Sequence, residues 1–173
     1  MQQIQKPQIE IQKIAVPTGK TESLTLSLQS GEVNINVGDN AKLSILEISQ
    51  PNCISKNSVS LGKNAVLELG ILCLESSEIE TQLTLAGAGA CANIGTIFLG
   101  RDGEKISLNT IINHVAPSTT SKTSIYGALK GKSTAKSLGN IKIEKTGQQT
   151  NAFLASHALL LDKNARAESV PAL

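Results

Sequence analysis

Apolar and polar residues alternate over a series of short stretches along this chain, and a turn signal follows most of them. Gly, Asn, Asp and Pro stand between the stretches. No stretch of about twelve residues repeats its apolar positions with the period of a helix. The pattern therefore predicts an all-β chain with little helix. The predicted strands are Ile9–Ile14, Ser23–Leu28, Val33–Val37, Leu43–Ile48, Ser58–Leu61, Val66–Leu74, Ile79–Leu85, Ala90–Leu99 and Ile106–Ile112.

A short motif with the consensus Gly-x-Asn-Ala marks several of the turns. Its clearest copies occupy 37–43 and 61–67, and weaker copies occupy 86–92 and 161–167. Self-similarity at the spacing of the first copies is typical of stacked turns that bury their apolar faces against one another. We therefore predict a right-handed parallel β-helix, a solenoid with about 24 residues per turn and a corner at each motif. A left-handed hexapeptide helix fits less well, because small aliphatic residues do not recur at every sixth position.

The composition of the 173 residues agrees with a coil of thin, even layers. Aromatic side chains are nearly absent, with two Phe, one Tyr and no Trp, so the predicted core consists of Leu, Ile, Val and Ala. The net charge of +2 is too small to predict a nucleic-acid partner. No apolar run approaches the ~20 residues of a membrane span, and the polar start lacks the apolar core of a signal peptide. These features predict a cytoplasmic protein that contacts neither nucleic acid nor membrane.

The three cysteines lack the spacing of a redox or zinc motif. Neither a C-x-x-C pair nor a disulfide framework is present, and the repeat does not place the thiols above one another. Cys73 lies in the apolar run 70–74, which favours a packing role, whereas Cys53 follows a Pro-Asn pair and is expected at the surface. The sequence assigns no chemical role to Cys53, Cys73 or Cys91.

The sequence also lacks the motifs of common catalytic sites. It has neither a Walker-type phosphate loop nor a Gly-x-Ser-x-Gly elbow, and the glycine-rich stretch 127–133 is too short for a phosphate loop. Polysaccharide cleavage on a β-helix needs two carboxylates on neighbouring turns, but one period after Glu47 stands Ile71. We therefore expect that this chain is not an enzyme.

The final third of the chain carries a more specific succession of segments. A His before a Thr- and Ser-rich stretch is followed by a Gly-Lys turn, a Gly-x-Ile-x-Ile strand, a Leu-Leu-Leu segment and a Pro-x-Leu end. In this order the chain resembles the core domain of SufB and SufD, the scaffold subunits of the Suf iron–sulfur cluster assembly system. The segments that carry the resemblance are 97–108, 113–117, 119–122, 127–131, 139–143, 147–150, 159–161, 165–168 and 171–173.

The resemblance implies a right-handed parallel β-helix, in agreement with the repeat. It divides the chain into a polar N-terminal segment 1–20 and a SufBD-like core domain 21–173. It further implies a scaffold or partner subunit in iron–sulfur cluster assembly that works with SufB-like and SufC-like proteins. No resident cofactor is expected, and an iron–sulfur cluster would be held only transiently in a complex.

Two departures from the family pattern bear on this function. In SufB a catalytic Cys precedes the Leu-Leu-Leu segment, where this chain has Ser156, and a hydroxyl cannot carry persulfide or bind iron as a thiolate does. The family also continues beyond Pro-x-Leu into a His-containing motif and helices that bind SufC, whereas this sequence ends at Leu173. The resemblance therefore indicates a shortened, SufD-like chain and leaves open whether a segment was removed or never existed.

The two histidines are the candidate ligands for a cluster. His157 is adjacent to Ser156, and His114 follows a predicted strand and precedes Pro117. A neutral imidazole is a suitable ligand for iron. His114 has the alternative role of bracing its turn through hydrogen bonds, and the pattern around His157 leaves its burial among Leu residues open. The identity of any metal at these positions stays unknown.

The last part of the coil is the predicted site of association. A parallel helix ends in strands with unpaired backbone groups, and such edges pair with other chains. In the resembled family two β-helices join near this end, so we expect a homodimer, or a heterodimer with a SufB-like chain, through 150–161 and 165–173. Leu159 and Leu161 are the interface residues predicted there. The alternative is a structural β-helix that polymerises end to end, as bactofilin-like proteins do, which the apolar end 170–173 leaves open.

Overall fold

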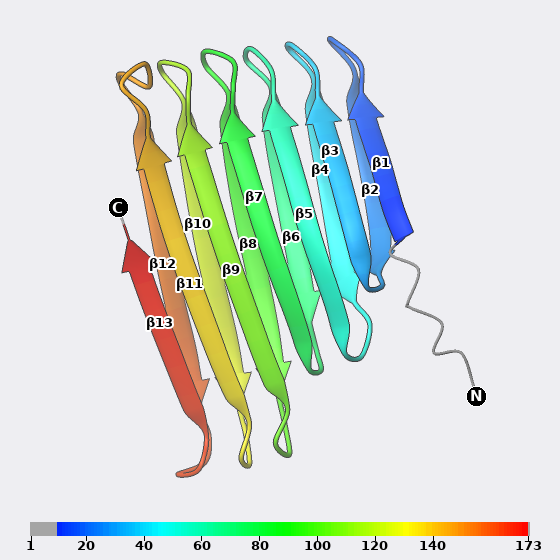
Figure 1. The fold of residues 1–173 in the computed structure, drawn as a ribbon, viewed down its shortest axis with the longest axis vertical. Helices are drawn as coiled ribbons and strands as arrows, with labels where there is room; N and C mark the ends of the chain where they lie inside the picture. Colours follow the sequence, from blue (N-terminus) through cyan, green and yellow to red (C-terminus); the bar gives the residue numbers. More distant parts are fainter. Residues whose placement is uncertain (1–9, 173) are drawn as a thin grey trace, which may run out of the picture.

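The structure, a computed structural model, describes residues 10–172 and consists of two parallel β-sheets that face each other (Figure 1). Each turn of the chain adds one strand to each sheet, so the odd-numbered strands form sheet A and the even-numbered strands form sheet B. All strand pairings among residues 10–172 are parallel, and these residues contain no helix. The predicted all-β parallel helix is therefore confirmed. The strands are β1 (Glu10–Val16), β2 (Thr21–Leu28), β3 (Gly31–Val37), β4 (Lys42–Ser49), β5 (Cys53–Leu61), β6 (Val66–Cys73), β7 (Ser77–Leu85), β8 (Cys91–Gly100), β9 (Lys105–His114), β10 (Thr120–Leu129), β11 (Thr134–Ile143), β12 (Asn151–Leu160) and β13 (Arg166–Ala172).

The corners explain why the motif contains both Gly and Asn. Asn40 and Asn64 adopt left-handed φ values of 56° and 52°, which Asn tolerates better than most residues. Gly62 is required for a different reason, because a Cβ there would collide with the corner of the preceding turn. In the weaker copy at 86–92, Gly89 takes the Asn position with a φ of 74°. Close stacking of the corners thus selects the glycine, and the backbone conformation selects the asparagine.

The fourth copy of the motif, at 161–167, does not continue this column of corners. It joins β12 to β13 at the opposite end of the strands. There the Leu161 amide donates to the Leu129 carbonyl over 2.8 Å, and the Gly131 amide donates to Asp162 over 2.8 Å. Its likeness to the other copies therefore reflects the shared requirements of a tight corner.

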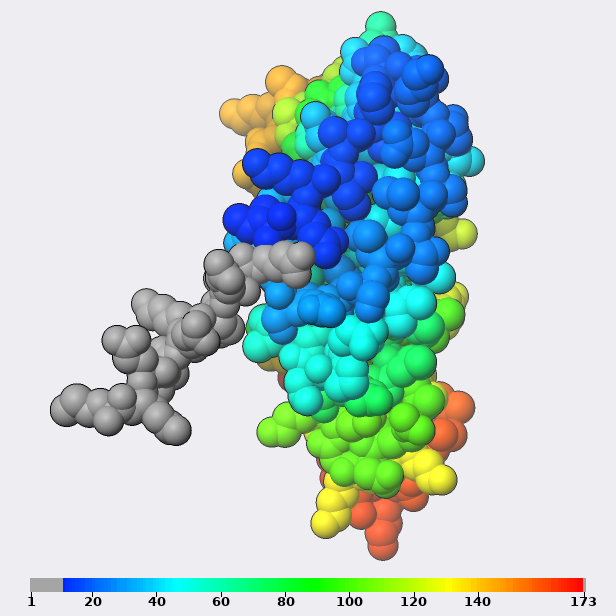
Figure 2. Space-filling view, turned by 90° about the vertical axis from the view of Figure 1, so that its right-hand side faces the viewer, coloured from blue at the N-terminus to red at the C-terminus, as the bar shows by residue number. Residues whose placement is uncertain are grey.

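The turns are not of one length, and the predicted period holds only in the middle of the coil. In sheet A, paired residues are 24 positions apart from β3 to β7, 21 apart before β3, and 29 to 32 apart after β7. Some of the added residues lengthen the strands, from seven or eight residues in β1–β4 to ten in β8–β12. The others lengthen the corners, since four residues separate β3 from β4 and seven separate β11 from β12. Figure 2 views the coil from the side of its first turn, in blue, with the later turns behind and below it. The pairs that give these spacings are Glu10 with Gly31, Val37 with Leu61, Cys53 with Ser77, Ser77 with Ile106, Lys105 with Thr134, and Thr134 with Arg166.

Alternate residues of most strands point between the sheets and form a core of Leu, Ile, Val and Ala. Ala41, Ala65 and Ala90 are buried and stack in one column at the corners, as predicted for the first two. Thr119 and Thr150 continue that column in the later turns. The column therefore changes from methyl groups to hydroxyl groups, which need hydrogen-bond partners.

The N-terminal segment contributes the first strand of sheet A. β1 lies within residues 1–20 and pairs in parallel with β3. The boundary at residue 20 between an N-terminal segment and a core domain stays a prediction. Residues 1–9, and Leu173 of the predicted interface, lie outside the described residues.

Candidate functional site

His114, one of the two candidate ligands, is a fully buried residue at the end of β9. Its Nδ1 and Nε2 each lie 2.8 Å from a hydroxyl oxygen, that of Thr119 and that of Ser121 respectively. The Thr119 hydroxyl donates to the Ala116 carbonyl over 3.2 Å, so we assign the ring proton to Nδ1, with Nε2 accepting from Ser121. Burial lowers the pKa of His114 and so favours the neutral ring. Both ring nitrogens are thus engaged by protein groups.

His157, the other candidate ligand, lies exposed on the outer face of sheet B. It stacks on Tyr126, its pairing partner in β10, with ring centroids 5.3 Å apart and an interplanar angle of 12°. The possible burial of His157 among Leu side chains therefore does not occur. Ser156, which the sequence resemblance places at the position of the SufB thiol, is half-buried beside Ile125 and points away from His157. Because His114 lies at the strand ends, the two histidines do not form one site.

The three thiols are shielded from solvent to different degrees. Cys53 is only 2% exposed, so the expectation that it lies at the surface is wrong. It is the first residue of β5 and points inward, and the following residue, Ile54, takes the outward position. Cys73 is buried, as predicted, and Cys91 is half-buried on the outer face of sheet B. Burial raises the pKa of all three thiols.

An acid whose burial the sequence did not predict, Glu47, lies inside the coil. Its side chain is 0% exposed, and its Oε2 accepts a hydrogen bond of 2.6 Å from Nδ2 of Asn57 in the opposite sheet. Desolvation raises the pKa of Glu47 to about 7, and the Asn57 bond lowers it by less. Oε1 of Glu47 and Oδ1 of Asn57 are both buried acceptors without a partner. Protonation of Oε1 supplies the donor that this acid–amide pair lacks.

The alternation of inward and outward residues along β4 is the feature of the sequence that indicates an inward position for Glu47. Leu43 and Ile45 point into the core, so Glu47 and Ser49, on the same face, point inward as well. The facing strand β5 likewise turns the polar residues Ser55 and Asn57 inward. The second and third turns of the coil therefore enclose a small polar region, which lies beside the buried thiols of Cys53 and Cys73 in the third turn.

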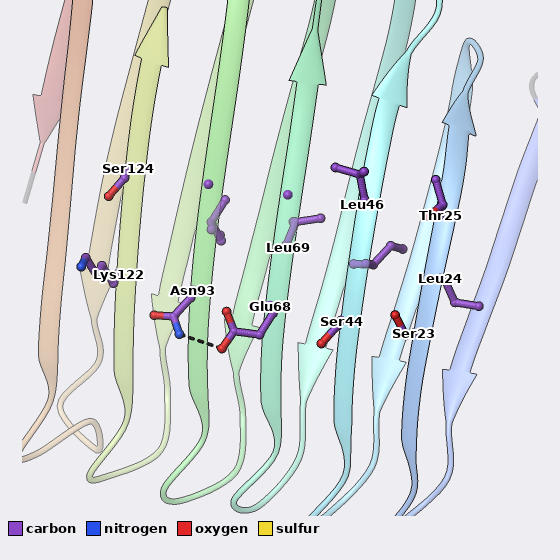
Figure 3. A pocket seen from close by; sticks show the side chains of 14 residues that line it. Ser23, Leu24, Thr25, Ser44, Leu46, Glu68, Leu69, Asn93, Lys122 and Ser124 are labelled. Atoms are coloured by element: carbon purple, nitrogen blue, oxygen red, sulfur yellow. Dashed lines mark hydrogen bonds between the residues drawn. The ribbon is translucent and has the colours of Figure 1, made fainter.

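The outer face of sheet B carries a groove that runs across the strands. Its polar side has a volume of about 660 Å³, and Nδ2 of Asn93 donates to Oε1 of Glu68 there over 3.0 Å (Figure 3). We call it the cross-strand groove and define it by three rows of residues that pair from one strand to the next. The floor is Leu46, Gly70, Gly95 and Ser124; the polar row is Ser44, Glu68, Asn93 and Lys122; and the apolar row is Ile48, Leu72, Ile97 and Tyr126.

The last described turn has an apolar surface that includes both residues predicted at an interface. Leu159 is 61% exposed and Leu161 is 53% exposed, and Leu160 between them is also exposed. Within residues 10–172, β12 pairs only with β10 and β13 only with β11, so each has one edge without a neighbouring strand. Association through this surface stays a prediction.

Metal ligands are dispersed over the described part of the chain. Among residues 10–172, no group of three His, Cys, Asp or Glu side chains lies close enough together to hold a metal ion. Over the same residues there is no helix long and apolar enough to cross a membrane.

Comparison with known proteins places this coil in a family. A family model described as the SufBD core domain of SUF system FeS cluster assembly matches residues 6–173. Iron–sulfur cluster assembly SufBD family proteins of Mycobacterium bovis and Mycobacterium tuberculosis are each 28% identical over 130 residues, which cover 69% of this chain and 32% of the relative. A SufBD family protein of Mycobacterium leprae is 26% identical over 129 residues, which cover 69% of this chain and 33% of the relative. The chain thus spans about a third of the length of these relatives. The match to the family model over nearly the whole sequence shows that the chain belongs to the SufBD core-domain family of iron–sulfur cluster assembly proteins.

Proposed function

We propose that this chain acts as a scaffold or partner subunit in iron–sulfur cluster assembly and is not itself an enzyme. The observation that carries the proposal is the state of its thiols. Cys53 and Cys73 are buried, and burial raises the pKa of both, so the reactive thiolate is scarce. At the position that matches the SufB thiol stands Ser156. A sulfur-carrying step would then take place on a partner.

The partners in this proposal are a SufB-like and a SufC-like protein in the cytoplasm. Support comes from membership of the family and from the apolar surface of the last described turn, where Leu159 and Leu161 are exposed. Exposed apolar side chains beside an open strand edge favour pairing with another chain. The chain would form a heterodimer with a SufB-like protein there, or a homodimer.

The cluster in this proposal is cargo that the complex holds transiently. His157 is the histidine whose ring reaches solvent, so it is the side chain of this chain that a passing cluster would meet. His114 is a weaker candidate, because the hydroxyls of Thr119 and Ser121 already occupy its two ring nitrogens.

The test is co-expression with the SufB-like and SufC-like proteins of the native host, followed by purification through a tag on this chain. We expect both proteins to be retained, and expect Leu159→Asp to weaken retention by about tenfold or more. Ile54→Asp is the matched control, because Ile54 is 62% exposed on sheet A in an early turn, against 61% for Leu159. Retention of neither protein, together with long heterogeneous species in light scattering, would replace the proposal with the polymerising structural β-helix.

A further inference from the structure

The cross-strand groove differs from the rest of the outer surface in its shape and composition. Gly70 pairs with Gly95, so two neighbouring strands have no side chain at the same level. A Cβ at Gly95 would meet nothing within 4 Å, so the space above Gly95 is open. At Gly70 a Cβ would lie 3.2 Å from Cδ1 of Leu46, so the Leu46 side chain leans over that end of the floor. From Gly70 and Gly95 the floor continues into Ser124 and then Ala155, so it consists of small residues from β6 to β12. Leu46 closes the floor at the β4 end.

The two borders of the groove have opposite character. On one side Ile97 is 58% exposed and Tyr126 is 53% exposed, and both belong to the apolar row. On the other side the Glu68 carboxylate is held by Asn93, and Lys122 follows one strand further (Figure 3). Apolar side chains exposed in a continuous row mark interaction sites more often than scattered ones do. The polar border also has a fixed order of charges: the acid Glu68 lies on β6, and the base Lys122 lies two strands further on, on β10.

The dimensions of the groove match those of an α-helix. The two borders are four residues apart along each strand, which corresponds to about 13 Å at ~3.3 Å per residue. A helix with its side chains is about 10–12 Å across. The apolar row crosses four strands, or about 14 Å at ~4.8 Å per strand, and this length accommodates about ten helical residues.

An extended peptide is a poorer occupant than a helix. The backbone groups of β6, β8 and β10 are already paired within sheet B, so a strand laid across them would find no hydrogen-bond partners. Strand addition takes place at sheet edges instead. A helix satisfies its own backbone and can therefore cover the face of a sheet.

We propose that the cross-strand groove is a docking site for an amphipathic α-helix of a partner protein. The helix lies across the strands, with apolar side chains on Leu72, Ile97 and Tyr126. It carries a Lys or Arg that faces Glu68 and, about seven residues further on, an Asp or Glu that faces Lys122. This spacing follows because the two groups are two strands apart, about 10 Å, and seven helical residues rise by a similar distance. The groove spans β4 to β10 of sheet B, whereas Leu159 lies on β12, one strand beyond Tyr126. The proposal does not depend on the identity of the partners proposed above.

The test uses photocrosslinking of the full chain in its native host. The photoreactive residue p-benzoylphenylalanine replaces Ile97, and in the control it replaces Ile54, an equally exposed apolar residue of sheet A. We expect an adduct from position 97 only. Mass spectrometry should place it in a partner segment with apolar residues at i, i+3 or i+4 and i+7, and with the predicted basic and acidic residues.

Two further variants decide whether the groove itself binds. Gly95→Leu fills the open floor and should lower the adduct yield by about tenfold or more, whereas Ser58→Leu on sheet A should leave it unchanged. Glu68→Lys, a surface change that keeps the fold, should weaken the adduct as well. In the crosslinking experiment, three results would overturn the proposal: no adduct at position 97, an adduct with a second copy of this chain, or a partner segment with strand-like alternation. In the variant experiment, it would be overturned if neither Gly95→Leu nor Glu68→Lys changed the yield of the adduct. A photoreactive residue at Leu159 tests the separate partner surface in the same cells.

Discussion

The buried acid Glu47 predicts that the protein becomes less stable as the pH rises through the neutral range. In the folded chain burial raises its pKa to about 7, against an ordinary value of 4.5. Between these values the folded state holds a proton that the unfolded state has released. Stability therefore falls as the pH rises above about 4.5, and the loss is complete above about 7. The shift corresponds to about 3 kcal/mol.

Substitution by Gln isolates this effect, because Gln has nearly the same shape and never ionises. Its amide can accept from Nδ2 of Asn57, as the acid does, and it offers an N–H donor on the side of the unpaired Oδ1 of Asn57. We expect Glu47→Gln to match the wild type at about pH 4.5 and to be about 3 kcal/mol more stable at about pH 8. The assay is urea unfolding at a series of pH values, with the difference between variant and wild type plotted against pH. Taking the difference cancels the titration of the other groups, including His114.

The refuting result is a difference that stays constant across the pH series. It would mean that Glu47 is charged in the folded protein, either solvated through local opening or paired with a cation. Glu68→Gln is the matched control for removing one acid from the chain, because Glu68 lies half-exposed on the outer face of sheet B. A pH-dependent gain of the same size in this control would show that net charge, rather than burial, is responsible.

The glycines and the buried histidine give further predictions, each measurable by thermal or urea unfolding. Gly127→Ala should destabilise the fold by about 1–3 kcal/mol, because its Cβ would collide with the Phe98 ring, and Phe98→Leu in the same chain should recover part of the loss. Gly95→Ala should instead stabilise by about 0.5–1 kcal/mol, since its Cβ enters open space within a strand; a loss of stability would contradict the open floor of the groove. Gly87→Ala should cost at least about 2 kcal/mol, because the backbone of the preceding corner blocks its Cβ, and full stability would show that the corners are not closely stacked. His114→Ala should cost about 1–3 kcal/mol, because it leaves the buried Ser121 hydroxyl without its partner and removes one partner of Thr119, whereas an unchanged midpoint would refute the bracing role.

Most of the coil was predictable from the sequence because two independent signals agree in its regular parts. Strand alternation and turn residues locate β6 to within one residue, and the repeated motif gives the stacking of Ala41 on Ala65. The period was measured from copies of the motif in the middle of the chain, and it does not extend to the longer turns that follow. The length of a turn depends on both its strands and its corners, and turns of different lengths can belong to the same stack.

The predictions that differ from the structure concern polar residues inside the coil. The predicted strand Ser58–Leu61 is the end of β5, which begins at Cys53. Its inward residues Ser55 and Asn57 are polar, so the apolar alternation that indicates a strand is interrupted there. For this reason the sequence predicts a surface position for Cys53. The sequence does not predict the cross-strand groove, and the reason is different. Gly70 and Gly95 become neighbours only through the pairing of β6 with β8, and a single sequence does not reveal that register.

The uneven turns also bear on how the chain avoids misfolding. In an array of identical repeats, any turn can stack on any other, so a nascent chain can skip a turn or exchange one with another molecule. Here a short turn from the middle of the coil, laid in the place of the longer last turn, would leave several positions without a partner. Unpaired backbone groups inside a stack are costly, so the widening of the coil disfavours the replacement of a later, longer turn by an earlier, shorter one.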